Sequence, residues 1–260
     1  MTERLPLAGI GVLVTRPAHQ AEPFCALVRE AGGEPIRFPT LEIAPASDPA
    51  PADALLGALG RFDLAIFISP NAVTWGLERA ARFGGLPTGL GIAAVGAATA
   101  RCLSQAGYPP QAVPEKSFDS EALLALPLLR DIDDKRVLIV RGEGGRPLLG
   151  DELHARGARI EYAEVYRRAL PQADPVPLLA RWARGEVKVV TVTSLEGLEN
   201  LRAMLGAAGE RHLTTTPMII AGERMAAGLR EAGYTEGARA ENASDAGMFE
   251  ALLSWALNEA

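Results

Sequence analysis

Small polar residues, glycines and arginines recur where apolar runs of the sequence give way to helical patterns. In a parallel sheet such turns meet at the carboxyl edge, where helix N-termini present free N–H groups to ligands. Arginines among them add positive charge. The set predicts a binding site for a polyanionic small molecule, made by Thr15, Arg16, Ser69, Asn71, Gly96, Thr99, Arg141, Gly142, Thr193, Ser194 and Gly222.

Helix capping is the simpler explanation for any one of these residues, because Ser, Thr and Gly are common at the starts of helices. The ligand site is favoured by the set as a whole, since matched turns occur in both halves of the chain. Carboxylates and histidines are scarce among them, so the pattern indicates binding through backbone donors rather than acid–base chemistry.

Tyr166 is the candidate catalytic residue. It lies in the extended segment EVYRRAL, which we expect to pass between domains. A phenol in such a place can donate a hydrogen bond and act as a weak acid. The alternative is an ordinary strand tyrosine, and the adjacent Arg167 and Arg168 are interpreted as a solvated pair.

Common catalytic signatures are missing from the sequence. The segment RGEGGRP begins like a dinucleotide-binding loop at Gly142 and Gly144, but Pro147 stands where the third glycine belongs. His19, His154 and His212 are isolated from one another in the sequence, so neither a metal site nor a catalytic triad is predicted.

Short apolar runs rich in β-branched residues would position these turns. They occupy 10–14, 64–68, 92–95, 137–140, 187–192 and 218–221, and each precedes a helical pattern. Such alternation predicts parallel sheets covered by helices, an α/β architecture. The units also repeat: GVLVTRP, ISPNAV and AVGAATA correspond to RVLIVRG, VTVTS and IAGERMAAG. The repeat predicts two related α/β domains, with crossings at 44–53 and 159–177.

Composition narrows the function further. A length of 260 residues favours two domains, and a net charge of −6 argues against a nucleic-acid partner. The sequence shows neither a long apolar span nor a signal-peptide pattern, so no membrane association is expected. Cys25 and Cys102 do not form a CxxC pair, which is typical of a reducing compartment, and we expect a cytoplasmic protein.

The whole chain resembles the uroporphyrinogen-III synthase family in the order of VLVTRP, ISPNAV, AVGAATA, VLIVRGEGGRPLL, EVYRRALP, VTVTS and IAGERMAAGLREAGY. The resemblance implies two flavodoxin-like parallel-sheet domains joined by a two-stranded linker, with the active cleft between them. It places one discontinuous domain at 1–37 and 171–260, a second at 46–160, and linker strands at 38–45 and 161–170.

The resemblance also implies a reaction. The linear tetrapyrrole hydroxymethylbilane closes to uroporphyrinogen III with inversion of ring D and loss of water, through an azafulvene and a spiro intermediate, without a cofactor. Tyr166 matches the family's cleft tyrosine and would assist departure of the hydroxyl, while the turns would bind substrate carboxylates. A cytoplasmic monomer is expected, supplied with hydroxymethylbilane by the preceding deaminase.

The sequence is also compatible with two other functions. One is a non-catalytic two-lobed binding protein for an anionic small molecule, and the other is a nucleotide-dependent enzyme using the RGEGG turn. One departure from the repeat also matters, because Glu223 and Met225 stand where the first half has Ala97 and Thr99. A carboxylate there would repel an anion unless it points outward.

Overall fold

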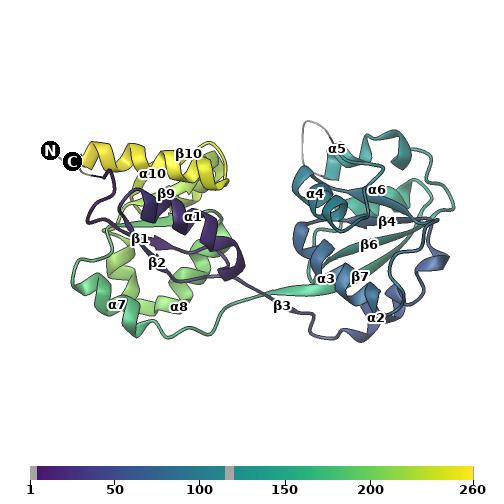
Figure 1. The fold of residues 1–260 in the computed structure, drawn as a ribbon, viewed down its shortest axis with the longest axis horizontal. Helices are drawn as coiled ribbons and strands as arrows, with labels where there is room; N and C mark the ends of the chain where they lie inside the picture. The colour runs from purple at the N-terminus through teal and green to yellow at the C-terminus, as the bar shows by residue number, and fades with distance from the viewer. Residues whose placement is uncertain (1–4, 115–119, 260) are drawn as a thin grey trace. The chain divides into compact units, whose positions relative to one another are not determined.

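The computed structural model of the chain describes residues 5–114 and 120–259. The chain divides into two compact units. Unit 1 comprises Met1–Glu42 and Ala169–Ala260, and unit 2 comprises Ile43–Arg168. Unit 1 is therefore made of two stretches that are distant in the sequence, whereas unit 2 is continuous (Figure 1).

Unit 1 holds a sheet with the strand order β10-β9-β8-β1-β2. Neighbouring strands pair in parallel, and β1 is buried along its whole length. The strands are β1 (Gly11–Val14), β2 (Glu34–Arg37), β8 (Val189–Val192), β9 (Met218–Ala221) and β10 (Glu236–Ala240).

Helices cover both faces of this sheet (Figure 1). Val12 and Val14 pack with residues of α1 and α10, whereas Leu13 between them packs with residues of α7, α8 and α9. This alternation explains why the strand is apolar throughout, since both faces are covered. The helices are α1 (Ala18–Glu30), α7 (Val176–Ala183), α8 (Leu195–Leu213), α9 (Gly222–Glu231) and α10 (Asp245–Glu259).

Unit 2 holds a second sheet, with the order β3-β7-β6-β4-β5. Ile66 and Ile139 pack with α5 and α6, and Phe67 and Leu138 pack on the opposite face with α2, α3 and α4. The strands are β3 (Glu42–Pro45), β4 (Leu64–Phe67), β5 (Gly91–Ala94), β6 (Arg136–Gly142) and β7 (Arg159–Ala169). The helices are α2 (Ala50–Leu56), α3 (Pro70–Ala81), α4 (Ala97–Gln105), α5 (Ser120–Leu124) and α6 (Leu148–Ala155), with 3-10 turns η1 (Leu59–Arg61) and η2 (Pro127–Leu129).

The two sheets share one spatial order with a permuted chain path. The run β9-β8-β1-β2 in unit 1 corresponds to β5-β4-β6-β7 in unit 2, and a parallel bridge from Ala93 to Ala112 takes the place of β10. The strand pairs matched by the sequence repeat therefore occupy equivalent positions. The prediction of two related parallel α/β domains is confirmed, and unit 1 has the flavodoxin strand order.

Two details differ from the sequence-based expectation. The segments 38–45 and 161–170, expected as linkers, contribute β3 and most of β7 to the sheet of unit 2, because β7 pairs with β6 from Arg159 to Tyr166. Strand β10 has the sequence EGARA, which contains no apolar run that would predict a strand. Its parallel pairing with β9 defines it. Among the described residues, no helix combines the length and apolarity needed to cross a membrane.

Candidate functional site

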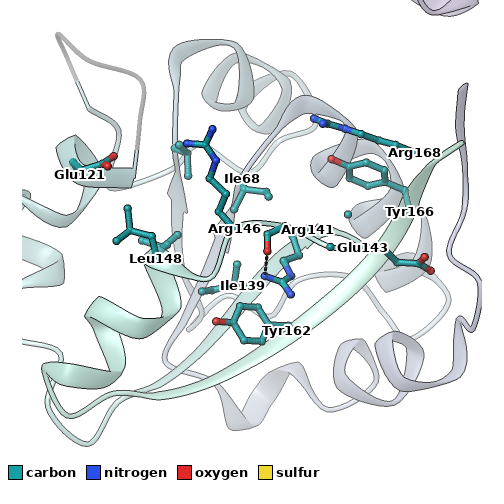
Figure 2. Close-up of a pocket in the computed structure, with 15 residues that line it drawn as sticks. Ile68, Glu121, Ile139, Arg141, Glu143, Arg146, Leu148, Tyr162, Tyr166 and Arg168 are labelled. Atoms are coloured by element: carbon teal, nitrogen blue, oxygen red, sulfur yellow. Dashed lines mark hydrogen bonds between the residues drawn. The ribbon is translucent and has the colours of Figure 1, made fainter. Parts of the chain in front are cut away.

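A pocket of unit 2, here called pocket A, lies at the carboxyl ends of its strands and has a volume of about 460 Å³. Ile68 follows β4, Val95 follows β5, and Tyr162, Tyr166 and Arg168 come from β7 or its end. The glycine-rich loop between β6 and α6, residues 143–147, forms much of the remaining wall (Figure 2). A site at this edge is where doubly wound sheets bind ligands.

A β-bulge places Tyr166 in pocket A. Arg141 pairs with Glu164 but Gly142 pairs with Tyr166, so Val165 is an extra residue in β7. The bulge re-aims the following side chain. Val165 and Tyr166 are consequently both buried in the same core cluster, although strand alternation would put them on opposite faces.

Two contacts then fix the Tyr166 side chain. Its ring lies against Gly142, where an added Cβ would come within 2.6 Å of ring carbons Cε2 and Cζ. Its hydroxyl is 3.1 Å from the Ser69 hydroxyl. The residue is only 3% exposed. Tyr166 is thus held in one position on the wall of the pocket.

Ser69 is the N-cap of α3. Its Oγ accepts a hydrogen bond of 3.0 Å from the backbone N–H of Ala72, and Pro70 stands at the first helical position. Both features are favoured at helix starts. The capping interpretation of Ser69 is correct, and Ser69 also contacts Tyr166, which the sequence does not reveal.

Arg141 organises the glycine-rich loop. Its Nη1 donates to the Gly145 carbonyl at 3.1 Å (Figure 2). Its Nε and Nη2 donate to Oε1 of Glu164 at 3.1 and 2.8 Å. The guanidinium also stacks over the Tyr162 ring, 4.0 Å from its centroid. Arg141 lines pocket A, and its guanidinium already has protein partners.

Glu143 is a carboxylate on the lining, which would oppose an anionic ligand. Its oxygens accept from the backbone N–H of Ser47 at 2.5 Å and from the Ser47 hydroxyl at 3.0 Å. Figure 2 shows the carboxylate turned away from Arg146. The exposed Arg146 and Arg168 bring positive charge to pocket A, the Glu143 carboxylate is bound by Ser47, and the exposed Glu121 is a second carboxylate on the lining.

A second pocket, here called pocket B, lies in unit 1 and has a volume of about 300 Å³. It is lined by the turns after β8 and β9, including Thr193, Ser194, Arg224 and Met225. Ser194 caps α8, its Oγ accepting from the Gly197 N–H at 3.1 Å. Ser194 and Ser69 therefore stand at equivalent places in the two units, as the sequence repeat predicts.

Thr15 and Arg16 are engaged within unit 1. Thr15 is not a helix cap, because Pro17 takes that position; its buried hydroxyl donates to the Thr191 carbonyl at 2.7 Å. Arg16 pairs with Asp245 and donates to the Ala243 carbonyl at 2.8 Å. Burial lowers the pKa of Arg16, with Asp245 acting in the opposite direction.

The remaining predicted residues lie in the first turns of helices. Asn71 and Gly96 are half-buried at the starts of α3 and α4, and Thr99 in α4 is 3% exposed. Gly222 has a φ of +74°, a conformation that favours glycine. Glu223 beside it is exposed and pairs with Arg230 and Arg239. The hydrogen bond from Arg230 lowers its pKa, so the carboxyl group stays ionised, and the two arginines offset its negative charge.

Tyr162 and the Glu143–Ser47 contact were not anticipated from the sequence. Tyr162 stands four positions before Tyr166, but the bulge at Val165 interrupts strand alternation between them, so their spacing gives no signal for Tyr162. Its hydroxyl packs so closely on Gly150 that an added Cβ there would clash with it. Glu143 and Ser47 are 96 positions apart in the sequence, so no local pattern predicts their contact.

The fold and these pockets define a class: a protein of two permuted, doubly wound α/β units with ligand pockets at the carboxyl ends of their strands. The family model described as uroporphyrinogen-III synthase HemD matches residues 22–250. The chain belongs to the uroporphyrinogen-III synthase family.

Individual relatives agree with this assignment. Uroporphyrinogen-III synthase of Escherichia coli (strain K12) is 34% identical over 94% of this chain and 100% of its own, and that of Salmonella typhimurium is 33% identical over the same shares. A solved mutant uroporphyrinogen III synthase from Thermus thermophilus is 26% identical, with a TM-score of 0.64 over 96% of this chain and 100% of that one. The Helicobacter pylori enzyme, 17% identical with a TM-score of 0.60 over 94% and 99% of the two chains, shares the fold.

Proposed function

We propose that the protein converts hydroxymethylbilane to uroporphyrinogen III, with inversion of ring D and loss of water, as a lyase that needs no cofactor. As a member of its family it is an enzyme of tetrapyrrole biosynthesis, the route to haem, sirohaem, cobalamin and chlorophyll. The observation that carries the proposal is the Tyr166 phenol fixed on the wall of pocket A in a chain of this family.

The reaction needs one proton at the leaving group. The C–O bond of the terminal hydroxymethyl group breaks as a proton joins the hydroxyl, water leaves, and the pyrrole nitrogen supplies the electron pair that forms the azafulvene. The substituted carbon of ring D then attacks to give the spiro intermediate. Fragmentation and recombination invert the ring, and the proton lost on rearomatisation replaces the one used.

Tyr166 is the group we assign to that first proton transfer. A positioned side chain acting as a general acid contributes typically about 10²–10⁴-fold to a rate. Its ring is fixed by Gly142 and its oxygen by Ser69, so the phenol is held in place before substrate arrives.

Substrate carboxylates are assigned to the positive parts of the two pockets. In unit 2 these are Arg146, Arg168 and the glycine-rich loop, and in unit 1 they are Arg224 and the helix start at Ser194. Helix N-termini and arginines attract carboxylates. Much of this binding would use backbone N–H groups, so single side-chain substitutions at Thr193 or Asn71 should have modest effects.

We further propose a cytoplasmic monomer that receives hydroxymethylbilane from the deaminase that makes it. Both cysteines are free thiols, which suits a reducing compartment. Transfer from the deaminase is favoured because free hydroxymethylbilane closes spontaneously to the uninverted isomer. Light scattering of the purified protein, alone and with the deaminase, tests both the monomer and the transfer complex.

The decisive assay supplies freshly generated hydroxymethylbilane to the purified protein without any cofactor. After oxidation of the products, uroporphyrin isomers I and III are separated chromatographically. Isomer III in proportion to enzyme supports the proposal. Isomer I alone, formed at the spontaneous rate while the protein binds the bilane, would instead identify a binding protein.

A further inference from the structure

The Ser69 hydroxyl makes two contacts that constrain the direction of its hydrogen bond. It accepts from the Ala72 N–H at 3.0 Å and lies 3.1 Å from the Tyr166 oxygen. A hydroxyl has one proton and two lone pairs. The helix takes one lone pair, so Ser69 keeps a proton that it can donate to Tyr166.

The surroundings favour donation by Ser69. A hydroxyl that accepts a hydrogen bond becomes a better donor, because hydrogen bonds in a chain polarise one another. Ser69 also sits at the N-terminus of α3, the positive end of the helix dipole. Both effects draw electrons from the serine oxygen and make its proton the stronger donor of the pair.

The direction matters for the phenol. If Ser69 donates, the Tyr166 oxygen accepts and its own proton points elsewhere. The ring is wedged against Gly142, and Tyr166 is on the lining of pocket A. If Tyr166 donated to Ser69 instead, its proton would be engaged inside the protein and unavailable to a ligand.

We propose that Ser69 is a positioning residue for the reaction. Its hydroxyl, which caps α3, donates a hydrogen bond to the Tyr166 oxygen. The phenol proton is then free to protonate the departing hydroxyl of the substrate. This inference rests on the proposed function. It gives one serine two tasks, helix capping and orientation of an acid, which the equivalent cap Ser194 in unit 1 does not combine in the described residues.

A double-mutant cycle with Tyr166→Phe separates the two tasks. Ser69→Ala should lower kcat about tenfold, as expected for loss of one orienting hydrogen bond, with little change in KM. In the Tyr166→Phe background the same substitution should change kcat by less than about twofold. The loss in Tm from the missing cap should appear in both backgrounds, and Ser194→Ala calibrates what losing a serine cap does to Tm.

Two further variants keep the test decisive if Ser69→Ala folds poorly. Ser69→Thr retains both a cap and a donor and should keep kcat within about twofold of wild type. Ser69→Asp caps the helix equally well, but an ionised carboxylate only accepts, so at saturating substrate kcat should fall at least as far as in Ser69→Ala while Tm is maintained.

The outcomes distinguish failure of the inference from failure of the proposed function. An active wild type in which the effects of Ser69→Ala and Tyr166→Phe on kcat multiply independently would overturn the inference alone. A Ser69→Asp variant with wild-type kcat would do the same. A wild type that makes only isomer I overturns the proposed function, and the inference with it.

Discussion

Gly142→Ala should displace Tyr166 and slow catalysis. The added Cβ would lie 2.6 Å from Cε2 and Cζ of the ring, whereas ordinary contacts begin near 3.4 Å, so the ring must move by about 0.8 Å or more. The Tyr166–Ser69 contact is already 3.1 Å long, and such a shift breaks it. Misplacing a reacting group by about 1 Å can cost about 10²-fold in rate.

The expected result is a kcat lowered by about one to two orders of magnitude. Overpacking should also cost about 1–3 kcal/mol of unfolding free energy. Gly89→Ala is the matched control, because an added Cβ there meets nothing within 4 Å and its φ is not in the left-handed region. Isomer III formation and urea unfolding are measured for both. A folded Gly142→Ala protein with wild-type kcat would refute the assigned position of Tyr166.

Two more predictions concern the loop of unit 2 and the core of unit 1. Arg141→Lys should destabilise unit 2 by about 1–3 kcal/mol in urea, because lysine cannot contact Glu164 and Gly145 together; unchanged stability would contradict this. Burial, and then the hydrogen bond to Glu210, raise the pKa of Tyr234 to about 12. The neutral phenol therefore stabilises the fold up to about pH 10 and loses this contribution toward pH 12, so Tyr234→Phe should flatten the fall in Tm across that interval.

The architecture was predictable because its signals are local. The strands β1, β4, β5, β6, β8 and β9 are each built on a short apolar run, and the caps Ser69 and Ser194 stand directly before helices. The repeat is visible in the sequence because equivalent strands of the two sheets are buried on both faces and therefore have similar apolar sequences.

The arrangement of the site depends on contacts that no local pattern contains. The bulge at Val165 turns Tyr166 toward Ser69, and strand alternation alone predicts the opposite face. Arg16 forms an ion pair with Asp245, which lies 229 positions away in the sequence. Such long-range pairing decides which polar residues of a turn remain available to a ligand.

The turnover of Tyr166→Phe at saturating hydroxymethylbilane tests the assigned role of this phenol most directly. The substitution removes only the hydroxyl, so the ring should stay against Gly142 and the pockets should still bind the substrate. We predict a kcat lower by about 10²-fold or more, the contribution typical of a general acid, with isomer III still the enzyme-dependent product. A Tyr166→Phe protein that forms isomer III at the wild-type rate would contradict the assignment of the proton to this phenol.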